Sequence, residues 1–156
     1  MQGDIVDAAT RSRMMSGIRG KDTKPELIIR RGLHALGFRY RLHDRQLPGR
    51  PDLVLPRWRA VIQIHGCFWH GHDCPLFRWP QTRQEFWRAK IGRNVERDRE
   101  VNEALDRAGW RVLTVWECAL KGPRRIGADA TVTRAAAWLR SDARTGEIRG
   151  TDGAGR

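Results

Sequence analysis

The segment HGCFWHGHDC (residues 65–74) constrains the fold most strongly, because it carries three of the five histidines and two of the three cysteines. Within it, Cys67, His72 and Cys74 follow the spacing C-x4-H-x-C, and the third cysteine, Cys118, lies much further along the chain. Zinc commonly takes four tetrahedral ligands from thiolates and imidazoles. These four side chains would complete such a shell, which predicts a structural metal site joining two distant segments. The alternative is that Cys118 is only a small buried hydrophobic residue.

Hydrophobic periodicity and turn residues predict the elements around these two segments. A helix begins after Thr23, where Glu26 stands at capping-box spacing, and ends by Gly37. Strands at 52–55 and 59–64 form a hairpin, and a third strand covers 111–116. A long helix at 83–108, which could break at Gly92, buries Val95, Val101 and Leu105, and a last helix covers 131–140. This order predicts a mixed α/β domain with one central sheet flanked by helices.

Composition divides the chain into three regions. Residues 1–22 are polar and basic, and we expect them to form an arm that orders on a partner. Residues 23–140 carry the predicted elements and form the domain. Residues 141–156 are rich in Gly, Asp, Thr and Arg, and we expect them to be disordered.

The net charge of +12, mostly from arginine, is typical of a protein that binds a polyanion such as nucleic acid. The alternatives are a solvated basic surface or the codon bias of a GC-rich genome. No apolar run approaches the roughly 18 residues of a membrane span, and residues 1–15 lack the apolar stretch of a signal peptide. We therefore expect a cytoplasmic protein that does not enter a membrane.

The predicted hairpin brings the start of one strand, Asp52, close to the end of the next, His65. This is the outline of the PD-(D/E)xK nuclease signature, with Gln63 in the acidic position and His65 in the lysine position. Asp52 and the Ile64 carbonyl could hold Mg²⁺, which prefers oxygen ligands. His65 and His70 could move protons, because imidazole titrates near neutral pH. The alternative is that Pro51 and Asp52 form an ordinary turn.

Four further residues have two interpretations each. Asp98 on the long helix could orient an imidazole or could be a plain surface carboxylate. Phe68, Trp69 and Trp87 are core residues by default. In a strongly basic protein, however, rigid loop aromatics could also insert between bases of a duplex.

Four motifs together resemble the very short patch repair (Vsr) endonucleases, over residues 10–120. They are LPGRPD, HGCFWHGHDC, TRQEFWRAKIGRNVERDR and GWRVLTVWECAL. The resemblance implies a restriction-endonuclease-like, PD-(D/E)xK-related fold. It also implies recognition of the T:G mismatch that deamination of 5-methylcytosine leaves, and a nick 5′ to the mismatched thymine. A repair polymerase would then replace the patch, and a cytosine-5 DNA methyltransferase would be functionally linked.

The resemblance also implies a role for each matching residue. Asp52 would bind Mg²⁺ with the main chain of Ile64, and His65 and His70 would be catalytic, with His70 the general base. Glu26 and Asp98 would support them. Structural zinc would be held by Cys67, His72, Cys74 and Cys118. Contacts to DNA would come from Phe68, Trp69, Trp87, Asn94 and, in the arm, Arg11, Arg13 and Met14.

The leading expectation is a monomeric, Mg²⁺-dependent mismatch nicking enzyme of the bacterial cytoplasm, associated with the nucleoid. Two alternatives remain open. One is a related restriction-type nuclease that cuts both strands of unmismatched sites. The other is a zinc-stabilised DNA-binding module without catalysis, although pure binding would not require Asp52, His65 and His70.

Overall fold

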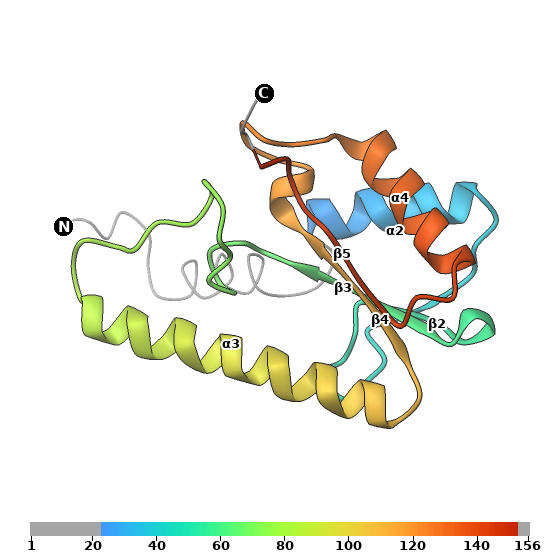
Figure 1. Ribbon diagram of the computed structural model, residues 1–156, viewed down its shortest axis with the longest axis horizontal. Helices are drawn as coiled ribbons and strands as arrows, with labels where there is room; N and C mark the ends of the chain where they lie inside the picture. The colour runs from blue at the N-terminus through green and yellow to red at the C-terminus, as the bar shows by residue number, and fades with distance from the viewer. Residues whose placement is uncertain (1–22, 153–156) are drawn as a thin grey trace, which may run out of the picture.

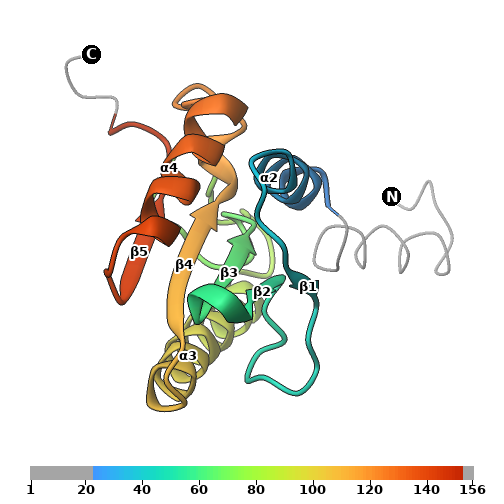
Figure 2. The same ribbon diagram turned by 90° about the vertical axis from the view of Figure 1, so that its right-hand side faces the viewer.

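The computed structural model describes residues 23–152, so the predicted arm with Arg11, Arg13 and Met14 lies outside the described residues. A five-stranded mixed sheet forms the centre, in the order β1-β2-β3-β4-β5. Its strands are β1 (Arg41–Leu42), β2 (Leu53–Leu55), β3 (Ala60–His65), β4 (Arg111–Trp116) and β5 (Thr145–Ile148). Helices α2 (Lys24–Ala35) and α4 (Ala128–Arg140) lie together on one face, and α3 (Gln84–Arg107) crosses the other (Figures 1 and 2). The expected mixed α/β domain is confirmed.

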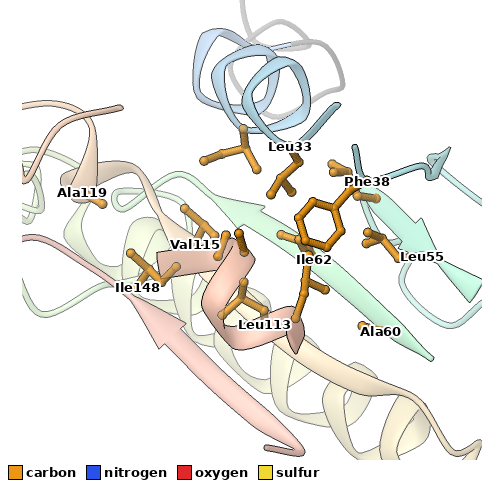
Figure 3. Close-up of a cluster of buried hydrophobic side chains, with 14 residues drawn as sticks. Leu33, Phe38, Leu55, Ala60, Ile62, Leu113, Val115, Ala119 and Ile148 are labelled. Carbon is orange, nitrogen blue, oxygen red and sulfur yellow. The ribbon is translucent and has the colours of Figure 1, made fainter. Parts of the chain in front are cut away.

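Two apolar cores hold these layers together. The larger core lies between the sheet and helices α2 and α4, and Figure 3 shows its buried Leu33, Ile62, Leu113 and Ile148. The smaller core packs Leu105 of α3 against Val54, Val61 and Val112 on the opposite face of the sheet. Strand β2 is buried on both faces, which explains why its sequence, LVL, is continuously apolar.

Strand pairing changes from antiparallel to parallel at β3, and this change determines where the predicted functional residues lie. Strands β2 and β3 are the expected antiparallel hairpin, joined by the short 3₁₀ turn Pro56–Trp58. Strands β3 and β4 are parallel, and His65 lies opposite Trp116 at their ends. The segment after β3 and the 3₁₀ turn Glu117–Ala119 after β4 therefore leave the sheet at the same edge. This register brings Cys118 to the HGCFWHGHDC segment.

Both helices predicted in the first two-thirds of the chain form. Thr23 caps α2, and its hydroxyl oxygen accepts a hydrogen bond from the Glu26 N–H at 3.4 Å. Helix α3 runs unbroken through Gly92, because one glycine costs only about 1 kcal/mol relative to alanine and the helix continues past it. Its buried residues are Ile91 and Leu105. Val95 is 45% exposed, so the prediction that Val95 is buried is wrong.

The expectation of a disordered segment at 141–156 is wrong for residues 145–148. They form β5, which pairs in parallel with β4 and buries Ile148 in the larger core. Gly146 permits this pairing, because a Cβ there would lie 2.5 Å or less from the Trp138 ring. The strand was missed because its sequence, TGEI, contains one apolar residue.

Within residues 23–152, none of the helices combines the length and the apolar character needed to cross a membrane.

Candidate active site and metal centre

A cavity of about 630 Å³ lies at the edge of the sheet where β3 ends. Helices α2 and α3 contribute to its wall, together with the segments around Asp52 and His65. All five of the predicted catalytic residues line it: Glu26, Asp52, His65, His70 and Asp98. The structure therefore brings into one space residues that the sequence spreads over more than seventy positions.

Asp52 precedes β2 and points toward β3 across the hairpin. Its Oδ2 accepts a hydrogen bond from the Ile64 N–H at 2.7 Å. Burial raises the pKa of Asp52 to about 7, the bond from Ile64 opposes this rise, and the nearby charge of Glu26 adds to it. A bound cation would reverse the effect by stabilising the carboxylate. Gln63, in the acidic position of the signature, is buried and accepts a hydrogen bond from the Thr114 hydroxyl at 3.4 Å.

His65 and His70 form a stacked pair, with ring centroids 3.8 Å apart and planes within 3° of parallel. His70 Nδ1 lies 2.5 Å from Asp98 Oδ2. If Nδ1 donates its proton to Asp98, the other ring nitrogen of His70 can accept a proton. Burial lowers the pKa of His65 well below its usual value, and the nearby His70 and His72 lower it further. His65 is therefore a neutral imidazole at neutral pH.

The four predicted metal ligands come together beside this cavity. One donor atom from each of Cys67, His72, Cys74 and Cys118 lies within 4.8 Å of the others, and three of the four residues are buried. Burial raises the pKa of Cys67 and of Cys118, so without a cation these thiols would keep their protons. Three thiols and an imidazole in one buried cluster suit a metal ion that stabilises thiolates.

Trp116, the last residue of β4, contacts both the predicted metal ligands and the predicted catalytic histidines. Its ring stacks on His72 at 3.8 Å and 9°, and contacts His65 edge-on at 5.2 Å. Its indole N–H donates to Glu147 of β5 at 2.7 Å. Just beyond β5, the Gly150 N–H donates to Cys118 Sγ at 3.3 Å. The segment that was expected to be disordered therefore supports the metal cluster.

The three aromatic residues that were predicted to insert between bases lie in one cluster. Phe68 contacts both Trp69 and Trp87, with ring centroids 5.2 and 5.4 Å away. Trp69 is only 8% exposed, whereas Phe68 and Trp87 are half-buried. The Asn94 side chain donates to the main-chain carbonyl of Trp69 at 2.9 Å, so it fixes the loop that carries the aromatics.

Glu26 is 1% exposed, and its partners include a residue that sequence reasoning missed. Its Oε2 lies 2.8 Å from both Arg30 Nη1 and His43 Nε2. His43 follows β1, a strand of two exposed residues that shows no periodicity. No signal in the sequence could therefore have placed His43 at the cavity.

Comparisons with known proteins identify the family of this chain. The family model described as DNA mismatch endonuclease Vsr matches residues 3–76. The DNA mismatch endonuclease Vsr of Escherichia coli (strain K12) is 46% identical over 145 residues, which cover 93% of each chain. The Type II nicking enzyme V.XorIIP of Xanthomonas oryzae is 44% identical over 117 residues, covering 75% of this chain and 86% of the relative. The Type II nicking enzyme V.NmeAIP of Neisseria meningitidis is 44% identical over 118 residues, covering 76% and 84%. The chain therefore belongs to the family of the DNA mismatch endonuclease Vsr.

Proposed function

We propose that this protein nicks double-stranded DNA at T:G mismatches, on the 5′ side of the mismatched thymine, with Mg²⁺ as its catalytic cation. Family membership makes it a strand-nicking DNA endonuclease, so the alternative of a non-catalytic binding module does not hold. The observation that carries the proposal is the single cavity shared by Asp52, the stacked His65–His70 pair and Asp98. A buried carboxylate beside two imidazoles suits hydrolysis of a phosphodiester.

The residues of the cavity would have different roles in hydrolysis. Asp52 and the main-chain carbonyl of Ile64 would hold Mg²⁺, which when bound neutralises charge developing on the scissile phosphate. His70, oriented by Asp98, accepts the proton of the attacking water. His65 is neutral and stacked on His70, so its ring N–H can donate a hydrogen bond to an oxygen of the scissile phosphate, while a water in the cavity would protonate the leaving oxygen.

The metal cluster suits zinc in a structural role. Zinc–sulfur and zinc–nitrogen bonds of about 2.3 and 2.1 Å at a tetrahedral angle separate the two ligand atoms by about 3.6 Å. Cys118 Sγ and His72 Nδ1 lie 3.6 Å apart. Four protein ligands leave no open position for a substrate. Zinc would therefore hold the loop that carries His70 and the aromatics, and would take no part in catalysis.

The aromatic cluster and the basic charge suit binding of a mismatched duplex. We propose that Phe68, Trp69 and Trp87 insert beside the mismatch, where unstacking costs less than in a paired duplex. Trp69 has little exposed surface, so its insertion requires the cluster to open. Arg11, Arg13 and Met14 of the arm would contact the minor groove, and Asn94 would hold the loop against the duplex.

Cutting of both strands, the restriction-type alternative, has less support, because the relatives are named as nicking enzymes. The mismatch would come from deamination of 5-methylcytosine, which functionally links the protein to a cytosine-5 DNA methyltransferase and to a repair polymerase. We propose that it acts as a monomer.

The first prediction concerns the reaction itself. With Mg²⁺, the full chain should nick the T strand of a T:G duplex and leave a perfectly paired duplex of the same sequence intact. Asp52→Ala should lose at least about 100-fold in nicking rate, because the cation loses its carboxylate, and should still bind the duplex. Denaturing gel electrophoresis of strand-labelled duplexes with varied flanks measures both activity and sequence context. Equal cutting of paired and mismatched duplexes would contradict the mismatch assignment.

A further inference from the structure

His43 lies on the wall of the catalytic cavity, and the mechanism above does not use it. Its Nε2 lies 2.8 Å from Glu26 Oε2, and its side chain is only 20% exposed. One ligand atom from each of Glu26, His43 and Asp52 lies within 4.8 Å of the others. His43 is therefore close enough to affect the carboxylates that face the catalytic cation.

The backbone of His43 is held in the left-handed region, with φ of 49°. This conformation is uncommon for residues other than glycine, although Asn, Asp and His adopt it several-fold more often than other residue types. The His43 N–H donates to the Asp52 carbonyl at 3.1 Å, which extends the pairing of β1 with β2 as far as the catalytic carboxylate. Glycine would adopt this conformation more easily. A histidine here, by contrast, directs an imidazole into the cavity, and strain of this kind clusters at functional sites.

The imidazole acts on Glu26 together with a second donor. Glu26 Oε2 lies 2.8 Å from both His43 Nε2 and Arg30 Nη1, and Glu26 is 1% exposed. Two donors on one oxygen fix the orientation of the carboxylate. They also offset the repulsion between Glu26 and Asp52 when both carry a charge.

We propose that His43 is a positioning residue that holds the Glu26 carboxylate beside Asp52, where Glu26 binds the water ligands of the catalytic cation. This inference rests on the proposed metal-dependent function. His43 is less suited to bind the cation itself, because its Nε2 is already directed at Glu26. The Arg30 guanidinium at the same oxygen would also repel a cation placed there.

Two matched substitutions test the proposal in the full-length, zinc-loaded protein. His43→Leu removes the donor, whereas His43→Gln keeps an N–H group that can reach Glu26. The first readout is Mn²⁺ binding, measured by electron paramagnetic resonance without DNA. The second is the single-turnover rate of T:G nicking at saturating enzyme. His34→Leu, which changes an exposed histidine of α2, is the control.

We expect H43L to bind Mn²⁺ about tenfold more weakly and to nick about 10–100-fold more slowly, as for other groups outside the direct ligands of a metal site. H43Q should stay within about threefold of the wild type in both readouts because the donor is retained. H34L should match the wild type. A third variant, His43→Gly, guards against misfolding, because glycine suits the positive φ while lacking the donor. It should show the H43L defects without a lower melting temperature.

The proposal is overturned if H43L and H43G match the wild type in either readout, or if H43Q is as impaired as H43L. A different result would refute the proposed function itself. A wild-type protein that binds Mn²⁺ but leaves every T:G duplex intact would refute mismatch nicking. The Mn²⁺ affinities of the variants would still decide the role of His43.

Discussion

The negative charge of Asp52 destabilises the folded protein, although the proposed cation binding requires that charge. Its carboxyl group is largely removed from water and lies near the negative Glu26, which raises its pKa to about 7. An ionised Asp52 therefore destabilises the folded protein unless a cation lies beside it. The same desolvation strengthens the attraction for a cation once it binds.

This conflict predicts an unusual pH dependence of stability. The pKa of Asp52 is higher in the folded protein, at about 7, than in the unfolded chain, at about 4. The unfolded chain therefore loses its proton first, and the carboxyl group lowers the free energy of unfolding as the pH rises from about 4 to about 7. The full effect is at most about 4 kcal/mol, because one pKa unit corresponds to about 1.4 kcal/mol. Asp52→Asn, which cannot ionise, should be more stable than the wild type at pH 8 and similar to it near pH 4.

Urea unfolding of zinc-loaded protein without added Mg²⁺, repeated across this pH range, measures the difference. Asp142→Asn, at an exposed carboxylate, is the control and should show no such trend. Added Mg²⁺ should reduce the advantage of D52N at pH 8, because it stabilises only the wild-type carboxylate. An advantage that grew toward low pH would contradict the assignment of the raised pKa to Asp52.

Among the elements, β5 shows where sequence reasoning succeeds and where it fails. The hairpin of β2 and β3 and the strand β4 were predicted because each is a clear apolar run between turn residues. Strand β5 has one buried residue, Ile148, and β1 has none, so neither shows a periodic pattern. The same limit applies to the site. Asp52 and His65 follow from the hairpin, whereas His43 depends on β1 and Glu147 depends on β5.

The segment after β5 should control how tightly the metal is held. Gly150 is buried, and a Cβ on it would lie 2.7 Å from the main-chain oxygens of Cys118 and Arg124. Gly150→Ala should push this segment away and break its hydrogen bond to Cys118 Sγ. We expect about a 10–100-fold loss of zinc affinity, as for other groups that support metal ligands. Competition with a chromophoric chelator measures that affinity.

Gly92→Ala is the matched control for this experiment, because a Cβ on Gly92 of α3 would meet nothing within 4 Å. It should keep the zinc affinity of the wild type and raise the free energy of unfolding by up to about 1 kcal/mol. If G150A holds zinc as tightly as the wild type, the segment after β5 does not support the metal site.

At the scale of the whole molecule, the net charge of +12 sets how the protein approaches DNA. Charge of this kind acts on the phosphate backbone and releases counterions, so it does not distinguish one sequence from another. We expect discrimination of the mismatch to come from the aromatic cluster and the cavity. Affinity for DNA and selectivity for the mismatch should therefore respond differently to salt.

We expect the affinity for a T:G duplex to fall about 1,000-fold between about 50 and 200 mM salt, as it does for proteins that contact about six phosphates. The affinity for a paired duplex should fall in parallel, so the ratio of the two affinities stays nearly constant. Fluorescence anisotropy with both duplexes over a salt series measures this. A ratio that collapses with salt would mean that charge, rather than the aromatic cluster, selects the mismatch.

The alternation of roles along residues 65–74 limits how this protein can change in evolution. The proposed metal ligands and the proposed catalytic imidazoles alternate along the same short loop, and Trp116 contacts members of both sets. An insertion or deletion between Cys67 and His72 would displace His70 from Asp98 as it displaced His72 from Cys118. Residues of this loop that have neither role can be substituted, but the number of residues in the loop cannot change. Loop length should therefore be nearly invariant among active relatives, even where their target sequences have diverged.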